Sequence, residues 1–140
     1  MKKFIILCLI TLFGCDNGQF KNNSAAPEMS AKRFFEAIYV HRNVQAAKPF
    51  SSRSIWEKLD HYYVPTSVQR HVFNLNMENV TIDIQDVEAD FFRKFTSDIT
   101  VTIKLVGFKK DRKWIDSRRV KIREENGLWV VYEIIPEQSR

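Results

Sequence analysis

The sequence contains little glycine, proline or cysteine, with four glycines, four prolines and two cysteines among 140 residues. With so few of them, a glycine-rich phosphate loop, a paired-cysteine metal cluster and the disulfide framework of small secreted proteins are all excluded. The residues that are present, 44% hydrophobic, 13% aromatic and 28% charged, match the usage of globular proteins. Low-complexity, collagen-like and disordered polypeptides are therefore excluded, and the length predicts a single domain.

The amino terminus carries the pattern of a secretory signal. Lys2 and Lys3 precede an apolar run from Phe4 to Phe13, and the small residue Gly14 follows. An apolar run of this length rises about 15 Å as a helix, which is roughly half of the 30 Å hydrocarbon core of a bilayer. A charged start, a short apolar centre and a small residue before a cleavage site indicate a signal peptide rather than a membrane span.

The end of this segment, Leu12-Phe13-Gly14-Cys15, resembles the lipobox of bacterial lipoproteins, although Phe13 is bulkier than the residue usual there. The resemblance implies that the Cys15 thiol is lipidated, as by palmitate, and that residues 1–14 are removed. The alternative is a cysteine that follows an ordinary cleavable signal by chance. Asp16 resembles the inner-membrane retention signal of enteric lipoproteins. The resemblance thus implies a lipid anchor on the periplasmic side of the cell membrane, with the inner membrane favoured by Asp16.

Residues 15–26 predict a flexible tether between this anchor and a folded domain at 27–140, because the run from Asp16 to Ala26 is polar and has no sustained period. A random coil of this length reaches about 20 Å, so we expect the domain to lie close to the membrane. A lipidated Cys15 has no free thiol, and Cys8 leaves with the signal. Cysteine catalysis and thiolate metal sites are therefore excluded from the mature chain.

Helices are expected in the first half of the domain. Phe34, Phe35, Ile38 and Tyr39 recur at three- and four-residue spacing, which predicts an amphipathic helix that starts near Pro27 or Ser30. A second, short helix is expected from Val44 to Lys48, with Asn43 as its cap and with Pro49 as its end, because proline lacks the amide proton.

Ser54 and Glu57 have the spacing of a capping box, which predicts a third helix from Ile55 to about Tyr63. Pro65 is expected to close this helical half. Residues 66–79 leave two alternatives, a short helical turn capped by Thr66 or Ser67, or a strand in which Phe73, Leu75 and Met77 alternate with polar residues.

After residue 79 the hydrophobic residues recur at every second position, which is the period of a strand. The alternation from Ile99 to Leu105 predicts a half-buried strand. Before this strand, Ile82 and Ile84 occupy even-numbered positions, whereas Val87, Ala89 and Phe91 occupy odd-numbered ones. An unbroken strand would therefore place the two sets on opposite faces. One extra residue near Gln85 or Asp86 would bring both sets to one face, so we expect a bulged and bent strand.

The last hairpin is expected from Lys113–Glu124 and Leu128–Ile135, joined by residues 125–127. Two registers fit the sequence. A bulged turn at Gly127 would place Trp129 and Val131 on the outer face of the sheet, whereas a two-residue turn would set Ile122 opposite Val131.

This order predicts an α+β fold, with three N-terminal helices packed on a strongly curved antiparallel sheet of about four strands. Over residues 27–136 the chain resembles the nuclear-transport-factor-two-like superfamily, a cone of helices and a curved sheet. The resemblance rests on element order, on the expected bulge and on the closing segment Asn126-Gly127-Leu128-Trp129-Val130-Val131. A cystatin-like meander with one helix across the sheet is the alternative.

Members of that superfamily include isomerase-like and dehydratase-like enzymes, small-molecule binders and periplasmic scaffold domains, so the fold does not select a function. Enzymes of this kind need an acid or base inside the cone. Asp60 and His61 point about 100° apart on a helix and do not form a dyad. We therefore predict no catalytic residue, no cofactor and no metal, and favour a non-enzyme. Residues that would line a pocket of the cone are Tyr39, His41, Trp56, Tyr62 and Phe95.

Four carboxylates occur close together at Asp83, Asp86, Glu88 and Asp90. They do not fit the calcium loop of a helix-loop-helix motif, because Phe91 stands where glycine is required. A polar outer face of the bent strand explains them.

Basic residues are concentrated between Gly107 and Arg123, which contains eight basic and two acidic residues in a chain of net charge +5. Near a membrane such a patch would meet anionic head groups or an acidic protein, or would be a solvated strand. Nucleic acid is not expected as a partner, because aromatic residues are not interleaved with the basic run. The basic patch predicted here comprises Lys109, Lys110, Arg112, Lys113, Arg119, Lys121 and Arg123.

Three functional hypotheses follow. The first is a lipid-anchored cell-envelope domain that binds a protein partner or forms a homodimer through the outer sheet face, with Trp129 and Val131 as anchors. The second is a cone-pocket small-molecule binder or isomerase-like enzyme, which a cone filled by aromatic side chains would exclude. The third is an immunity or exclusion lipoprotein.

Overall fold

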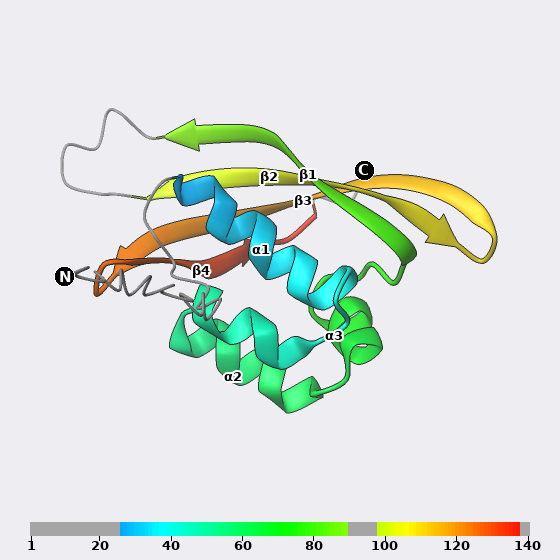
Figure 1. Cartoon of the computed structure of the whole chain (residues 1–140), viewed down its shortest axis with the longest axis horizontal. Coiled ribbons are helices and arrows are strands. Elements are labelled where there is room, and N and C mark those ends of the chain that lie inside the picture. The colour runs from blue at the N-terminus through cyan, green and yellow to red at the C-terminus, as the bar shows by residue number, and fades with distance from the viewer. Residues whose placement is uncertain (1–25, 90–97, 138–140) are drawn as a thin grey trace, which may run out of the picture.

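Helices form the first half of the domain and a single antiparallel sheet the second, which confirms the predicted α+β class (Figure 1). The computed structural model describes residues 26–89 and 98–137. The helices are α1 (Pro27–Tyr39), the 3-10 helix η1 (Val44–Phe50), α2 (Arg53–Tyr62) and α3 (Pro65–His71). The strands, in the order β1-β2-β3-β4, are β1 (Glu78–Ala89), β2 (Ile99–Lys109), β3 (Arg112–Glu125) and β4 (Leu128–Ile135).

Helix α1 begins at Pro27, as predicted, because proline has the fixed φ of a first helical residue and needs no amide partner there. Its apolar stripe, including Phe34, Phe35, Ile38 and Tyr39, is buried. The helix crosses the sheet and contacts all four strands, while α2 and α3 pack beside it on the same side (Figure 1). The core therefore lies between α1 and the inner face of the sheet.

The next two helices differ from their predicted ends. Asn43 caps η1 as expected, since its side chain accepts a hydrogen bond from the Ala46 amide, but η1 continues through Pro49 to Phe50. Helix α2 starts two residues before Ile55, and its cap is Ser52 rather than Ser54. The Ser52 hydroxyl accepts from the Ile55 amide at 3.4 Å.

Proline 65 opens a helix instead of closing the helical half, so the domain has a fourth helix, α3. The residue fits because its fixed φ suits the first turn and its missing amide costs no helical hydrogen bond. After α3 the chain turns at residues 72–74, where Asn74 has a positive φ of 49°, and β1 begins at Glu78. Phe73, Leu75 and Met77 are buried, but they do not form a strand. The helical alternative for residues 66–79 is therefore the one that occurs, as α3, although its N-cap is Val64 rather than Thr66 or Ser67.

Strand β1 carries the predicted bulge. Ile84 pairs with Ile103 and Asp86 with Thr102, which leaves Gln85 as the extra residue. The bulge brings Val87 to the face that carries Ile82 and Ile84, although Val87 remains 40% exposed. Phe91 lies outside the described residues.

The β3–β4 hairpin has the two-residue turn, with positive φ at Asn126 (52°) and Gly127 (79°). Ile122 is therefore opposite Val131. Val131 is fully buried, and Trp129 is half-buried against the core, so the predicted placement of these two residues on the outer face is wrong. Tyr132 is the extra residue of a register shift between Lys121 and Ile122.

One edge of the sheet is covered by the segment between η1 and α2. Ser51 forms a parallel bridge with Val131 of β4, and the Ser52 amide donates to the Val131 carbonyl at 2.8 Å. Helix α2 also contacts β4. The edge formed by β4 is thus tied to the helical layer.

Gly107 lies where β2 passes the start of β1, and a side chain there would collide with the neighbouring strand. A Cβ atom at this position would be 2.7 Å from the Glu78 carbonyl oxygen and 3.0 Å from a methyl of Val80. We expect Gly107→Ala to lower the free energy of unfolding by about 1 to 3 kcal/mol in urea denaturation, because backbone must move. Lys113→Ala, an exposed change on β3, is the control and should stay within about 0.5 kcal/mol. Equal losses would contradict the steric argument.

Candidate functional site

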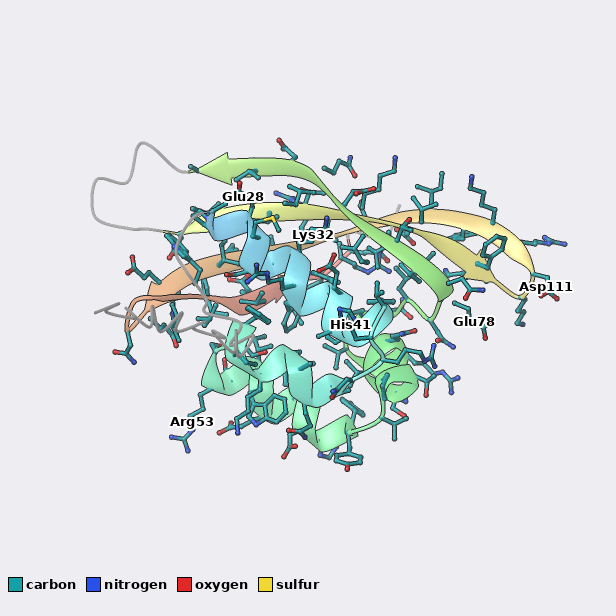
Figure 2. The ribbon with its side chains drawn as sticks, viewed as in Figure 1. Glu28, Lys32, His41, Arg53, Glu78 and Asp111 are labelled. Atoms are coloured by element: carbon teal, nitrogen blue, oxygen red, sulfur yellow. The ribbon has the colours of Figure 1, made fainter. Side chains whose placement is uncertain are left out.

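The four predicted pocket residues within the described part of the chain have separate neighbours and do not line a common cavity there. Tyr39 is buried, and its hydroxyl donates to the Leu75 carbonyl at 2.7 Å. His41 is exposed just after α1 (Figure 2). Trp56 lies under the Lys48 ammonium at 5.2 Å. Tyr62 stacks on the His71 ring at 5.0 Å, and Phe95 lies outside the described residues.

Aromatic rings occupy the space between α1 and the sheet. The Phe35 ring centroid is 5.5 Å from that of Phe34, 5.1 Å from that of Phe73 and 6.3 Å from that of Tyr39. All four side chains are at most 3% exposed. Rings at these separations are in contact, so this part of the interior is filled by side chains.

Gln69 is the one fully buried amide side chain of the described residues, and it is satisfied. Its amide nitrogen donates to the Ile38 carbonyl at 3.3 Å, and its oxygen accepts from the Met77 amide at 3.2 Å. A buried polar group with both partners is a structural tie. Gln69 connects α3 to α1 and to the segment that leads into β1.

The predicted basic patch divides into two parts. In the second half of β3, each cation of the patch lies near a carboxylate: Arg119 lies 3.5 Å from Glu88, Lys121 lies 2.8 Å from Glu133, and Arg123 lies 2.6 Å from Glu125. The first pair reaches across β2 to β1, the second links β3 to β4, and the third lies within β3. This half of the patch therefore has little free positive charge.

The other half of the patch is the hairpin tip, which we define as residues 106–115. Lys109 lies over the Trp114 ring at 4.2 Å. Lys110, Arg112 and Lys113 form no ion pair with any residue of 26–89 or 98–137. The unpaired positive charge of the patch is thus concentrated at the tip.

The hairpin tip also exposes large apolar side chains. Phe108 is 42% exposed, Trp114 43% and Ile115 59%. The register pairs Val106 with Ile115 and Gly107 with Trp114. Because Gly107 shares the inner face with Leu105, Trp114 lies on the helix side of the hairpin, whereas Val106, Phe108 and Ile115 lie on the outer face.

The hairpin tip projects past the helical layer. In Figure 1, the β2–β3 hairpin extends beyond α3 at one end of the long axis, and α1 begins near the other end. Figure 2 shows Asp111 of the turn at that end and Glu28 of α1 far from it. The tip and the start of the domain are therefore at opposite ends of the molecule.

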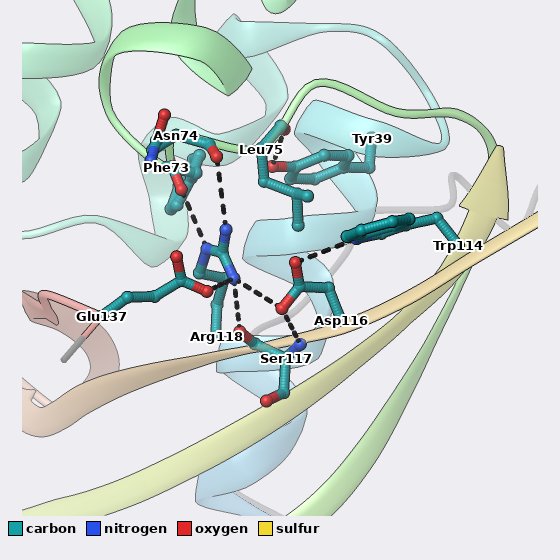
Figure 3. Close-up of polar contacts among 9 residues, drawn as sticks. All are labelled: Tyr39, Phe73, Asn74, Leu75, Trp114, Asp116, Ser117, Arg118 and Glu137. Atoms are coloured by element: carbon teal, nitrogen blue, oxygen red, sulfur yellow. Dashed lines mark hydrogen bonds and ion pairs between the residues drawn. The ribbon is translucent and has the colours of Figure 1, made fainter. Parts of the chain in front are cut away.

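A buried arginine supports the base of this hairpin (Figure 3). Arg118 is 3% exposed. Its Nε donates to the Phe73 carbonyl at 2.9 Å, and its Nη1 donates to Asp116 at 3.0 Å and also to Glu137. Nη2 donates to the Asn74 carbonyl at 3.4 Å. Arg118 thus ties β3 to the segment after α3 and to Glu137, the second residue after β4.

The same cluster fixes the exposed indole of the tip. The Trp114 Nε1 donates to Asp116 Oδ2 at 3.1 Å, while Asp116 Oδ1 accepts from Arg118 and from the Ser117 amide (Figure 3). Arg118 therefore positions Asp116, and Asp116 positions Trp114. This cluster was not predicted from the sequence. The inward parity of Arg118 with Val120 and Ile122 is the signal that could have found it.

These contacts make the fold sensitive to acid through Asp116. Burial raises the pKa of this carboxyl, but hydrogen bonds from Trp114, the Ser117 amide and Arg118 outweigh it, so the net pKa is below the usual 3.8. A lowered folded-state pKa gives stability that is present above the unfolded pKa and lost as pH falls through the folded one. We expect the midpoint of unfolding to decrease as the pH is lowered below about 4. In Asp116→Asn this decrease should be less steep. An equally steep decrease in both proteins would contradict the assignment to Asp116.

A second exposed apolar group lies on the helical layer, at the corner between α2 and α3. Tyr63 is 68% exposed and Val64 is 48% exposed. Tyr63 has φ 58° and ψ −45°, and the Val64 amide donates to the Tyr62 carbonyl at 2.6 Å. This is a γ-turn with positive φ, a strained conformation for tyrosine. The strain holds an aromatic side chain outward, next to the stacked Tyr62 and His71 rings.

Several predicted features fall outside the described residues or have no counterpart within them. Cys15 and Asp16 lie outside. In residues 26–89 and 98–137, no group of three or more His, Cys, Asp or Glu side chains is placed to hold a metal ion. No helix of these ranges is both long and apolar enough to cross a membrane.

Comparison with known proteins gives one informative likeness. No family model matches the sequence, and no curated protein matches it. The fold is similar to the NMR solution structure of TraH from the Gram-positive conjugative plasmid pIP501, which is described as a candidate transfer protein. The TM-score is 0.55 at 12% identity, over 84% of this chain and 95% of TraH. At this identity the likeness concerns the fold alone.

Proposed function

We propose that this protein is a lipid-anchored cell-envelope lipoprotein whose domain is a non-catalytic binding module for a protein partner or for further copies of itself. One observation carries the proposal: aromatic rings fill the interior around Phe35, while Tyr63 is held outward at a strained corner. A filled interior disfavours a cone-pocket enzyme or small-molecule binder, and an exposed tyrosine is a residue type typical of interface hot spots. The resemblance to the nuclear-transport-factor-two-like superfamily, some of whose members are periplasmic scaffold domains, supports the proposal.

The anchor is proposed from the lipobox-like segment that ends at Cys15. Mass spectrometry of the protein purified from membranes should find a mature amino terminus at Cys15 that carries fatty acyl chains. Cys15→Ser is the matched control and should leave the leader attached. A wild-type chain that retains residues 1–14, or that has an unmodified thiol, would refute the anchor and leave the binding module to be judged separately.

The partner contact is proposed at Tyr63 and Val64. A photo-crosslinking residue at position 63 in the membrane-bound protein should give a band of discrete mass, and the same residue at the exposed Lys58 of α2 should not. A band of twice the chain mass would indicate self-assembly, and another discrete mass a protein partner. Val64→Ser should weaken the band. Equal labelling at positions 58 and 63 would contradict the contact.

A conjugation-related role is the second candidate function, favoured by the fold shared with TraH, a candidate transfer protein of a conjugative plasmid. It includes the possibility of an exclusion lipoprotein. Mating efficiency should change when recipient cells carry the protein, and the change should depend on Tyr63. An efficiency that is the same with and without the protein would remove this candidate.

A further inference from the structure

We propose that the outer face of the hairpin tip binds the surface of an anionic bilayer, which gives the domain a second contact with the membrane that holds its anchor. The inference rests on the proposed function only for placing the domain beside a membrane. Its own basis is the combination of Phe108, Ile115 and Lys113 on that face with two further unpaired cations at the projecting end of the hairpin, Lys110 of the turn and Arg112, which is opposite Lys109 on the helix side.

The contrast with the rest of β3 indicates that the charge at the tip is available. Arg119, Lys121 and Arg123 lie within 3.5 Å of carboxylates. The cations of the tip have no such partner in the described ranges, and the turn contributes one carboxylate, Asp111. Each basic residue close to an anionic leaflet strengthens binding about fivefold. The tip, rather than the second half of β3, is therefore the part of the basic patch that an anionic surface attracts.

The chemistry of the tip favours lipid over an acidic protein. Residues 106–115 contain no Ser, Thr, Asn, Gln or Tyr, and three of the four cations are lysines. Protein interfaces carry about one hydrogen bond per 100 to 200 Å² and are depleted in lysine. At a bilayer surface, by contrast, lysine side chains extend to the phosphates while apolar side chains beside them enter the head-group region.

The dimensions of the domain allow the lipid anchor and the hairpin tip to contact the membrane at the same time. The tip and the first residue of α1 lie at opposite ends of the long axis (Figure 2). Strand β3 has 14 residues, which corresponds to a length of about 46 Å. A tether reaching about 20 Å leaves the domain free to lie along the membrane. In that orientation the outer face of the hairpin tip is toward the lipid, and Tyr63 on the helical layer remains accessible to a partner.

The rigidity of the hairpin supports the same assignment. Trp114 and Lys109 pack on its helix side, and Arg118 fixes its base through Asp116. Phe108 and Ile115 are therefore presented without a loss of backbone freedom on binding, which is the advantage of a preorganised surface.

The test uses the full mature chain, residues 15–140, with Cys15→Ser, so that no lipid is attached to the protein. Its partition onto phosphatidylcholine vesicles with and without about one-third phosphatidylglycerol is measured by co-sedimentation. We expect binding only to the anionic vesicles. The triple variant Lys110→Gln, Arg112→Gln, Lys113→Gln should bind about 100-fold more weakly, and Ile115→Ser several-fold more weakly.

The matched control is Arg119→Gln, Lys121→Gln, Arg123→Gln, which removes the same number of positive charges from β3. It should bind within about fivefold of the parent chain. Equal losses in the two triple variants, or equal binding to neutral vesicles, would overturn the proposal. An absence of vesicle binding would also overturn the proposal. Tip-dependent binding of polyglutamate would in that case assign the tip to an acidic protein. Circular dichroism checks the fold of every variant, and the result does not depend on the state of Cys15.

Discussion

Arg118→Met is expected to lower the free energy of unfolding by about 3 to 5 kcal/mol, because it removes one partner from a buried network. Arg118 is 3% exposed and donates to two carboxylates and to the carbonyls of Phe73 and Asn74. Methionine matches the length of the stem but donates nothing. Asp116 then stays half-buried without its cation, and the two carbonyls lose their donor.

Urea denaturation followed by far-ultraviolet circular dichroism measures this loss. The adjacent Arg119→Met is the control, because the Arg119 side chain is 48% exposed and pairs with Glu88 at the surface. Such pairs contribute about 0 to 1 kcal/mol. If the two variants lose the same stability, Arg118 does not hold the network that the hairpin tip depends on.

The second large effect is expected at the centre of the aromatic cluster. Phe35→Ala removes a ring that is fully buried and lies 5.1 Å from the Phe73 ring. Large-to-small changes of this kind cost about 3 to 5 kcal/mol, from lost transfer free energy and from the cavity that remains. Since a small domain has a total stability of about 5 to 15 kcal/mol, the variant should lose a large fraction of its stability.

Phe108→Ala offers the same chemical change at a residue that is 42% exposed. It should cost less than about 1 kcal/mol in the same urea experiment, because no cavity forms at the surface. The comparison also tests the proposal for the hairpin tip, since Phe108 should tolerate truncation without loss of fold. A stability loss at Phe108 equal to that at Phe35 would mean that the tip is part of the core.

Local patterns predicted the elements that depend on neighbours in the sequence. The stripe from Phe34 to Tyr39 predicted α1, and the change of parity after Ile84 predicted the bulge at Gln85. In both cases one buried face fixes the arrangement, and its period is visible in the chain. The ends of α2 were not predictable in this way, because Ser52 and Ser54 are both good caps. Ser52 caps the helix, and its amide is also held by Val131, far along the sequence.

The site was harder to predict because its residues are paired across strands. The basic run looks uniform in sequence, yet Lys121 has Glu133 as a partner and Lys110 has none within the described ranges. The register that decides this depends on the turn at Asn126 and Gly127, for which the sequence allowed two conformations. For the same reason, Val131 and Trp129 were assigned to the wrong face.

The tie between Ser52 and Val131 also determines how the sheet could grow. With the β4 side held by the helical layer, β1 is the terminal strand of the described sheet that has no such cover. Addition of a foreign strand there would meet the bulge at Gln85 and the carboxylates of Asp83 and Asp86, and bulges and charges both discourage edge-to-edge aggregation. Self-assembly of this domain would therefore proceed by side-chain contacts rather than by extension of the sheet from one chain to the next.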